Sequence, residues 1–326
     1  LPLAYPAAPA TAAAVLSGPM ISAGVLGWIR FLPPGQLSGS GWGERLLAMG
    51  VVGAALGVLA GLLQRDPRSV LAYSSIAKMG LVAAVFGIAL TQPHAAPGVI
   101  AALVVFTMHH LMLKGTLFVG IGEWQRHGAR PWLIATLGIL MLALIGAPFT
   151  SGAGAKLLLS EATNGAGFDL GLLFGFSALG TLFLMARVLW LIRLRPATVA
   201  AGPDPASLVW LALAALAILM PLMQKPMPWS SSGLGPIAAG LGIIAVYALL
   251  RRTVSLTSPT VPPGDVLYLM GAARRVSTRE ATRLHFTLSP RVLVSPATDH
   301  NAARTLGVLL WLFVCVLLVA AGLLPG

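Results

Sequence analysis

Charge is what this sequence has least of. Only 9% of its 326 residues carry a charged side chain, whereas 57% are hydrophobic and the mean hydropathy is +0.88. Soluble domains have about 25% charged residues, so a compact globule of this composition could not cover itself with a solvated surface. The composition therefore argues against a soluble enzyme, a nucleic-acid-binding module and a disordered tail, and it predicts a membrane protein.

Acidic residues and cysteine are also scarce. The chain has 9 Asp and Glu against 21 Lys and Arg, a net charge of +12, and a single cysteine, Cys315, inside an apolar run. A basic excess on so apolar a chain is typical of cytoplasmic loops, so no nucleic-acid partner is expected. One cysteine permits neither an intrachain disulfide nor a cysteine-held metal cluster.

Motifs for cofactor binding are missing as well. There is no G-x-G-x-x-G, no H-E-x-x-H and no cluster of paired carboxylates, and the stretch 152–156 lacks the Gly-Lys-Ser/Thr order of a phosphate loop. The sequence thus predicts no cofactor, no metal site and no catalytic residue. Whether the chain is an enzyme stays open, and we expect at most a non-redox subunit of an oxidoreductase complex.

Long apolar runs dominate what is present. A helix needs about 20 residues to span roughly 30 Å of hydrocarbon. Nine runs reach this length, at residues 10–31, 45–63, 69–91, 98–122, 131–163, 168–192, 205–223, 233–250 and 305–324. The sequence therefore predicts an all-α, polytopic transmembrane helix bundle with about nine crossings.

The fifth run, 131–163, is too long for one regular helix. Pro148 lacks an amide donor and the glycines at 146 and 152 are conformationally permissive, so we expect two half-helices joined by an unwound segment at membrane depth.

The distribution of basic residues tests whether this broken segment crosses the membrane once. If it does, six arginines in the loops between the predicted helices and the eight arginines in 251–304 lie on one side of the membrane. Only Arg30, Arg45 and Lys225 then lie on the other side. The arginine-rich side is then cytoplasmic. If the chain instead turned back at the break, every later loop would change sides and the difference in arginine number between the two sides would shrink.

These boundaries divide the chain into four parts. We expect 1–193 to form a transmembrane core, 194–250 additional transmembrane helices, 251–304 a basic cytoplasmic loop and 305–326 a C-terminal transmembrane helix. The loop suits either an amphipathic helix on the membrane face or a solvated segment whose arginines set the topology. No basic residue precedes residue 17 to form a signal peptide, and we expect further sequence upstream.

Four basic residues lie inside the predicted spans. Arg187 is about two turns from a helix end and can extend its guanidinium to the membrane surface, so a structural role is expected. Lys78, Lys114 and Lys156 lie deeper, where a lysine costs about 2.5 to 3.5 kcal/mol on insertion scales. No carboxylate lies within a turn of them on the same face. Burial disfavours the charged ammonium, so such lysines can relay protons; static pairing with a carboxylate of another helix or subunit is the alternative.

A histidine accompanies the second of these lysines. His110 and Lys114 share a helix face at i and i+4, with Thr107 one turn earlier, and the three predict a proton wire. His109 points roughly 100° away and is expected to donate a hydrogen bond in helix packing.

Polar side chains follow Lys156 and precede Lys78. Ser160, Thr163 and Asn164 continue a stripe from Lys156 toward the non-cytoplasmic end, which predicts an exit path, whereas Lys78 has a thinner lining in Ser74 and Ser75. A broken helix that carries a buried charge is typical of ion-translocating transporters built from inverted repeats. The strings Ala-Pro-Ala-Thr at 8–11 and Ala-Pro-Phe-Thr at 147–150 suggest such a repeat.

The few acidic residues are expected outside this path. Asp66, Glu123 and Asp204 lie at loop boundaries, where we predict solvated or capping roles. Glu161 lies in the half-helix after Lys156, about 140° from the face of that lysine.

Several motifs together resemble one known family, the proton-conducting antiporter-like membrane subunits of respiratory complex I, of Mrp antiporters and of formate hydrogenlyase-type hydrogenases. They are Leu-Pro-Leu-Ala-Tyr-Pro at 1–6, Leu-Ser-Gly-Pro-Met-Ile-Ser at 16–22, Leu-Ala-Tyr-Ser-Ser-Ile-Ala-Lys-Met-Gly at 71–80, the segment 110–118, and Pro-Phe-Thr-Ser-Gly at 148–152 followed by Lys156. The first two look closest to the hydrogenase branch. After about residue 193 the chain resembles the family only in being apolar.

The resemblance implies an inverted-repeat bundle with lysine-centred half-channels, and it implies that 1–193 is the C-terminal part of the family's proton-translocating, antiporter-like core. Lys114 matches the family's central lysine and Lys156 that of the second broken helix. Three positions depart from the pattern: Ser22 stands where many members have lysine, and Lys78 and Tyr5 stand where histidine is common. The family's glutamate and first broken-helix lysine would precede Leu1, so a partner or an upstream segment would supply the uptake half of the path.

These observations lead to one hypothesis with two rivals. The expected function is a proton-translocating membrane subunit of a complex-I-like or membrane-hydrogenase-like assembly, with the lipid bilayer and other membrane subunits as its partners. It would be a multi-pass protein of the bacterial inner membrane. The rivals are a non-conducting structural subunit and a transporter of another cation or of inorganic carbon on the same scaffold.

Overall fold

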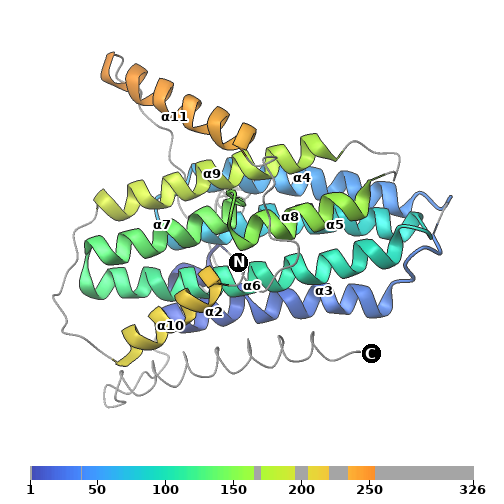
Figure 1. Ribbon diagram of the computed structural model, residues 1–326, viewed down its shortest axis with the longest axis horizontal. Helices are drawn as coiled ribbons and strands as arrows, with labels where there is room; N and C mark the ends of the chain where they lie inside the picture. The colour runs from blue at the N-terminus through green and yellow to red at the C-terminus, as the bar shows by residue number, and fades with distance from the viewer. Residues whose placement is uncertain (1, 38, 165–169, 195–204, 220–233, 254–326) are drawn as a thin grey trace, which may run out of the picture.

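All regular structure in the described residues is helical. The computed structural model describes residues 2–37, 39–164, 170–194, 205–219 and 234–253 (Figure 1). Its helices are α1 (Ala4–Ala7), α2 (Ala10–Ser17), α3 (Pro19–Phe31), α4 (Trp42–Leu62), α5 (Pro67–Thr91), α6 (Ala96–His127), α7 (Pro131–Ile145), α8 (Ser151–Thr163), α9 (Gly171–Leu194), α10 (Pro205–Leu219) and α11 (Leu234–Thr253).

The predicted polytopic helix bundle is confirmed. Five helical segments are long and apolar enough to cross a membrane, namely Ala10–Phe31, Trp42–Leu62, Pro67–Thr91, Ala96–His127 and Gly171–Arg193. Shorter apolar helices occupy Pro131–Ile145, Ser207–Leu219 and Gly235–Ala245. The predicted crossing at 305–324 and the basic loop, apart from its first three residues in α11, lie outside the described residues.

The first predicted helix, 10–31, is divided. Pro19 begins α3 and cannot donate an amide hydrogen bond, and Gly18 between α2 and α3 has φ −103° and ψ −88°. A Cβ on Gly18 would lie 3.2 Å from the carbonyl oxygens of Ala14 and Leu111. The predicted span 10–31 is confirmed as one apolar segment, and the structure adds an interruption at Gly18, where the chain packs against α6.

The predicted break in the fifth run is confirmed. α7 ends at Gly146, which has a left-handed conformation with φ 84° and donates its amide to Leu142 and Ala143. Phe149 also has a positive φ, 65°. After Pro148 the Thr150 hydroxyl donates to the Ala147 carbonyl at 2.6 Å, and α8 begins one residue later. Figure 1 shows α7 and α8 end to end, the arrangement that a single interrupted crossing requires.

Gly152 lets the two half-helices approach closely. A Cβ at this position would clash with the Ala143 carbonyl oxygen and would lie 3.0 Å from the Gly146 Cα. Only glycine therefore fits where the first turn of α8 crosses the end of α7.

α5 and α6 form the centre of the bundle. Both are buried on nearly all sides over their middle turns, as expected for helices surrounded by other helices. α4 covers α5 and turns its other face outward, where Met49, Val52, Leu56 and Leu59 are 57 to 71% exposed. This face suits lipid or another membrane subunit.

Glycines allow α4 and α5 to touch through their backbones. Gly43, Gly50 and Gly57 recur every seven residues on α4, opposite Gly80 and Gly87 of α5. A Cβ on Gly50 would lie 2.5 Å from the carbonyl oxygen of Gly80, and a Cβ on Gly80 would lie 2.5 Å from that of Gly50. Small residues that permit such close approach are characteristic of helix packing in membranes.

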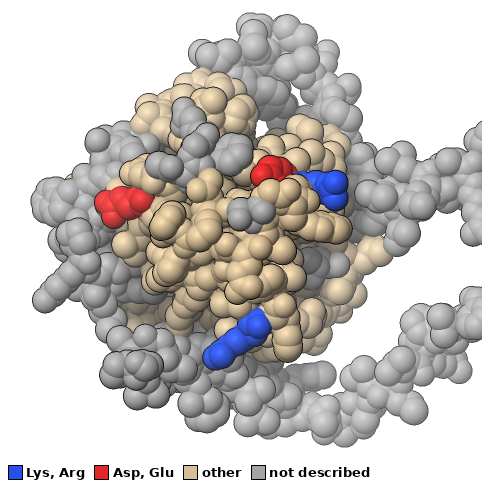
Figure 2. Space-filling view, turned by 90° about the vertical axis from the view of Figure 1, so that its right-hand side faces the viewer, with Lys and Arg blue, Asp and Glu red and all other residues tan. Residues whose placement is uncertain are grey.

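Described charged side chains gather at one end of the bundle. The end formed by the start of α5, the end of α6 and the end of α9 carries Arg65, Asp66, Arg68, Glu123, Arg126, Arg130 and Arg193. Among the described residues, the opposite end, which faces the viewer in Figure 2, shows fewer charged side chains. The segregation agrees with the predicted topology, in which the arginine-rich end is cytoplasmic.

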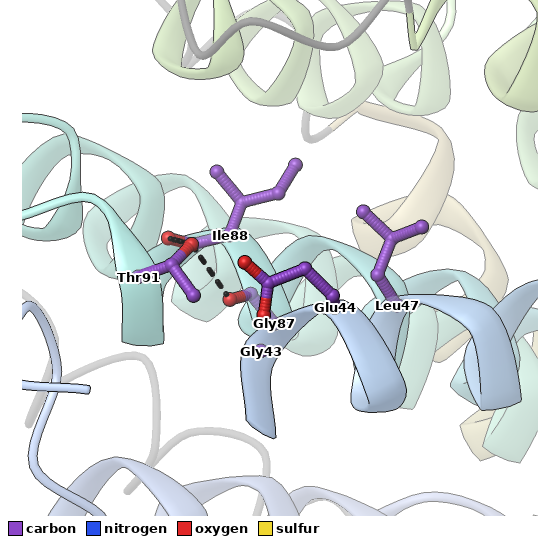
Figure 3. Close-up of a pocket in the computed structure, with 6 residues that line it drawn as sticks. All are labelled: Gly43, Glu44, Leu47, Gly87, Ile88 and Thr91. Atoms are coloured by element: carbon purple, nitrogen blue, oxygen red, sulfur yellow. Dashed lines mark hydrogen bonds between the residues drawn. The ribbon is translucent and has the colours of Figure 1, made fainter. Parts of the chain in front are cut away.

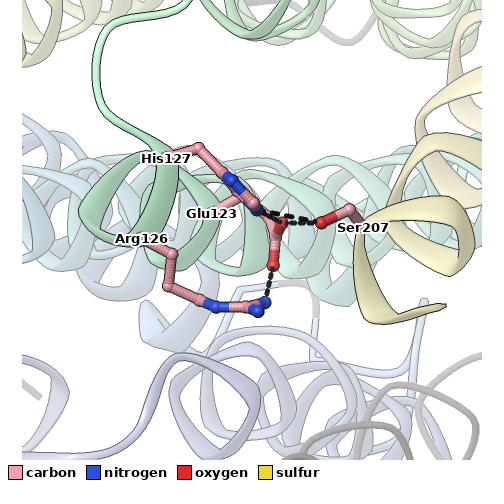
Figure 4. Close-up of polar contacts among 4 residues, drawn as sticks. All are labelled: Glu123, Arg126, His127 and Ser207. Atoms are coloured by element: carbon pink, nitrogen blue, oxygen red, sulfur yellow. Dashed lines mark hydrogen bonds and ion pairs between the residues drawn. The ribbon is translucent and has the colours of Figure 1, made fainter. Parts of the chain in front are cut away.

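Glu123 lies at the contact between α6 and α10 rather than in solvent. Its Oε2 accepts a hydrogen bond from Ser207 Oγ at 2.5 Å and lies 3.3 Å from His127 Nε2, while its Oε1 lies 3.1 Å from Arg126 Nη1 (Figure 4). The side chain is buried. The predicted solvated or capping role was wrong because α10, which is distant in sequence, covers this end of α6.

The other boundary acids differ from Glu123. Asp66 accepts hydrogen bonds from the amides of Arg68 and Ser69 at 2.9 and 3.3 Å and caps α5, as predicted. Asp204 lies outside the described residues.

Candidate functional site

Lys114 lies at the centre of the bundle and is fully buried. Its amine donates to the Leu71 carbonyl of α5 at 2.7 Å and to the Ser74 hydroxyl. The hydroxyl of Ser74 in turn donates to the same carbonyl at 3.1 Å. Ser74 was expected beside Lys78, one turn later on its own helix, but it serves Lys114 instead.

Lys78 is also buried and bridges three helices. From α5 its amine donates to the Ser177 hydroxyl of α9 at 3.1 Å and lies 6.0 Å from the ring centroid of Phe106 on α6. Ser75, the other expected neighbour, bonds back to Leu71 of its own helix. Sequence reasoning missed Ser177, although its signal is visible as a hydroxyl inside an apolar run.

Lys156 lies at the break between α7 and α8. It sits on the second turn of α8, and its amine donates back to the Ile145 carbonyl at the C-terminal end of α7. A Cβ on Gly146 would lie 2.9 Å from the Lys156 Nζ, so glycine makes room for the amine. The last carbonyls of a helix lack partners within the helix and carry partial negative charge. The broken helix thereby supplies the acceptor that holds this amine.

None of the three lysines forms an ion pair within the described residues. Their hydrogen bonds go to hydroxyls and backbone carbonyls. In this part of the chain the acids outside the α6–α10 contact lie toward the ends of the bundle, on exposed or half-buried positions, namely Glu44, Asp66 and Glu161. The three amines are therefore held by neutral dipoles, which can remain in place whether an amine is charged or neutral.

The histidines of α6 leave polar atoms without partners. His110 is buried, and within the described residues neither of its ring nitrogens has a hydrogen-bond partner; the same holds for the hydroxyl of Thr107. The predicted wire from His110 to Lys114 is thus not a direct hydrogen bond. Buried polar atoms in this state are ordinarily satisfied by ordered water, so bound water is what would complete the wire.

His109 does not form the packing hydrogen bond expected of it through Nε2. That atom is buried and lacks a partner among the described residues. Lys78 lies on α5 one turn after Ser74, whose hydroxyl the Lys114 amine contacts.

The stripe after Lys156 reaches the surface. Ser160 is half-buried, Thr163 is buried and Asn164 is exposed at the end of α8. The Thr163 hydroxyl donates to the carbonyls of Leu159 and Ser160 at 2.9 and 3.1 Å, within its own helix. An exit path along these side chains remains a prediction.

Positions that depart from the expected pattern are used for packing. The Tyr5 hydroxyl donates to the Leu16 carbonyl at 3.1 Å, and its ring packs edge-on against Phe118 with centroids 5.0 Å apart. Ser22 donates to Gly18 of the preceding turn at 3.2 Å. Arg187 donates to the Gln64 carbonyl at 2.9 and 3.2 Å just beyond α4, in keeping with a structural role.

A small hollow lies apart from the lysines. It is bounded by the start of α4 and the end of α5, with Gly43, Glu44, Leu47, Gly87, Ile88 and Thr91 as its lining (Figure 3). The Thr91 hydroxyl there donates to Gly87 and Ile88 of its own helix at 3.4 and 3.2 Å. The hollow is a by-product of the glycine contact between the two helices.

Comparison with known proteins agrees with this architecture. Residues 1–183, which include all three lysines and both half-helices, match the family described as NADH:quinone oxidoreductase/Mrp antiporter, TM. The chain is 31% identical over 175 residues to hydrogenase-4 component B of Escherichia coli K12, a match that covers 47% of this chain and 26% of that protein.

Two further relatives come from different complexes. Formate hydrogenlyase subunit 3 of Escherichia coli K12 is 34% identical over 137 residues, which cover 40% of this chain and 22% of that protein. NADH-quinone oxidoreductase subunit N of Rhodobacter capsulatus is 34% identical over 148 residues, or 41% of this chain and 30% of that protein. The matches thus span less than a third of each of these relatives. With the family match over more than half of its length, the chain belongs to the NADH:quinone oxidoreductase/Mrp antiporter transmembrane family.

Proposed function

We propose that this chain carries protons across the membrane as a subunit of a complex-I-like or hydrogenase-like assembly. The observation that carries the proposal is the set of three lysines inside the bundle, Lys114 and Lys78 buried and Lys156 half-buried, whose amines are bound only by neutral groups in the described residues. The matched region is only a fraction of the relatives' length. We therefore assign to this chain only the part of a proton route that runs between Lys114 and Lys156.

Electrostatic coupling between the amines gives this route a mechanism. A cation near a second amine disfavours the charged form of that amine. Lys78 lies on α5 one turn after Ser74, the hydroxyl that the Lys114 amine contacts, so a proton that arrives on Lys114 would promote release from Lys78. We propose the same effect of Lys78 on Lys156. The hydroxyls of Ser74 and Ser177 can accept from an ammonium and donate to an amine, so they serve both states.

The driving energy must come from outside this segment. Moving one charge against 100 mV requires about 2.3 kcal/mol. The relatives' names place them in hydrogenase, formate hydrogenlyase and NADH-quinone oxidoreductase complexes. We accordingly propose other subunits of such a complex as partners and the bacterial inner membrane as the location.

The test is proton uptake by the full-length protein in proteoliposomes under an imposed potassium diffusion potential. Lys114→Met and Lys156→Met remove an amine at either end of the proposed route. We expect each to reduce uptake by about 100-fold or more, the low end of what a positioned proton-transfer group contributes. Arg45→Met removes a positive charge from the exposed part of α4 and should leave uptake unchanged.

Other outcomes separate the rival functions. Normal assembly with unchanged uptake in both lysine variants would contradict the proposal and favour a structural subunit. Uptake that depends on sodium or bicarbonate and not on the proton gradient would favour a transporter of another ion.

A further inference from the structure

His109 and His110 are consecutive residues of α6 that face different lysines. Neighbouring helical residues point about 100° apart. His110 shares the face of Lys114, four residues later. His109 lies one turn after Phe106, the ring beside which the Lys78 amine is placed at 6.0 Å.

α8 brings Lys156 to the same level of α6. The two helices run antiparallel (Figure 1), and a Cβ on Gly98 would lie 3.9 Å from the Cβ of Ala162. Lys156 precedes Ala162 by six residues, so at a rise of 1.5 Å per residue it stands opposite about residue 104 of α6. Its amine reaches back toward Ile145 and hence further along α6, in the direction of His109.

The environment of His109 agrees with a place between two lysines. Its Nε2 is buried and has no hydrogen-bond partner in the part of the chain that the structure describes. A buried imidazole nitrogen without a protein partner is a site for water or for a proton donor.

We propose that His109 transfers protons between Lys78 and Lys156, while His110 transfers them between Lys114 and Lys78. Lys78 then exchanges protons with both histidines. In each transfer an ammonium gives a proton to one ring nitrogen, directly or through water, and the ring releases a proton from its other nitrogen to the next amine. The ring returns to the neutral form as its other tautomer, and exchange of the tautomers through water or rotation of the ring resets it for the next proton. This inference rests on the proposed function.

The experiment measures potential-driven proton uptake by the full-length protein with His109 replaced. His109→Gln keeps hydrogen-bonding groups of similar size but cannot carry a proton, and we expect it to reduce uptake by about 100-fold. For His109→Ala we expect the same loss and a partial recovery when imidazole is added, a response that a purely structural histidine would not give. His94→Gln, at an exposed position between α5 and α6, is the matched control and should transport normally.

The outcomes distinguish this inference from the proposed function. If Lys114→Met abolishes uptake while an assembled His109→Gln protein transports normally, the role of His109 is overturned and the lysine route stands. If His109→Ala loses uptake but imidazole restores none of it, the proton-carrying role is likewise overturned. If Lys114→Met also transports normally, the proposed function itself fails.

Discussion

Replacing Lys78 with Met is expected to abolish proton uptake, and replacing it with His is expected to preserve a measurable part. In the proposed route Lys78 stands between Lys114 and Lys156, so its loss should interrupt the route at its middle. Histidine offers a nitrogen that titrates near neutral pH and is common at this position in the family that the sequence resembles. We expect a loss of about 100-fold or more for the Met variant and a clearly smaller loss for the His variant.

The comparison of the two variants excludes a packing effect. Both remove the hydrogen bond from Lys78 to Ser177 and the placement of the amine beside Phe106, so a merely structural lysine would make them equally defective. The measurement is uptake in proteoliposomes, with assembly checked by the amount of intact protein recovered. Equal uptake in the Met variant and the unaltered protein would remove Lys78 from the route.

Gly50→Leu is expected to separate α4 from α5. The new side chain would begin 2.5 Å from the Gly80 carbonyl and the Ala84 amide, and these atoms are backbone, so only a movement of the helix can relieve the clash. Overpacking of a core typically costs about 1–3 kcal/mol and sometimes more, and we expect the upper end of that range or loss of assembly.

Gly53→Leu provides the matched control for this prediction. Gly53 lies on the same helix one turn later, and a Cβ there would have nothing within 4 Å. Both variants replace a helical glycine with a better helix former, so only the contact with α5 differs. The measurement is the midpoint of thermal unfolding in detergent; equal midpoints for the two variants would contradict the backbone contact between α4 and α5.

Helix positions were predictable because burial in a membrane demands apolar runs, but helix lengths were not. The predicted segment 98–122 corresponds to α6, which continues to His127. Hydropathy marks the part of a helix inside hydrocarbon, and α6 extends past it through Glu123 and Arg126. The break at 146–150 was visible because glycine and proline occur together there. The same pair at Gly18 and Pro19 was overlooked inside a run of uniform hydropathy.

The candidate site was predictable in its residues and not in its partners. Lysines are conspicuous in apolar helices because their burial is costly. Their acceptors, the carbonyls of Leu71 and Ile145 and the hydroxyl of Ser177, depend on which helices pack together. Backbone carbonyls carry no sequence signal at all. The burial of Glu123 was missed for the same reason, since it requires α10 to lie against α6.

The central claim is a hydrated connection between the three amines, and the most direct test is a cryo-electron microscopy map of the assembled complex at a resolution that shows water. We predict ordered water density hydrogen-bonded to the ring nitrogens of His110 and to Nε2 of His109, buried atoms that lack partners among the described residues. It should link Lys114 through Lys78 to Lys156. A dry axis filled by leucine and phenylalanine side chains, or a carboxylate of another subunit bound to each amine, would contradict the claim.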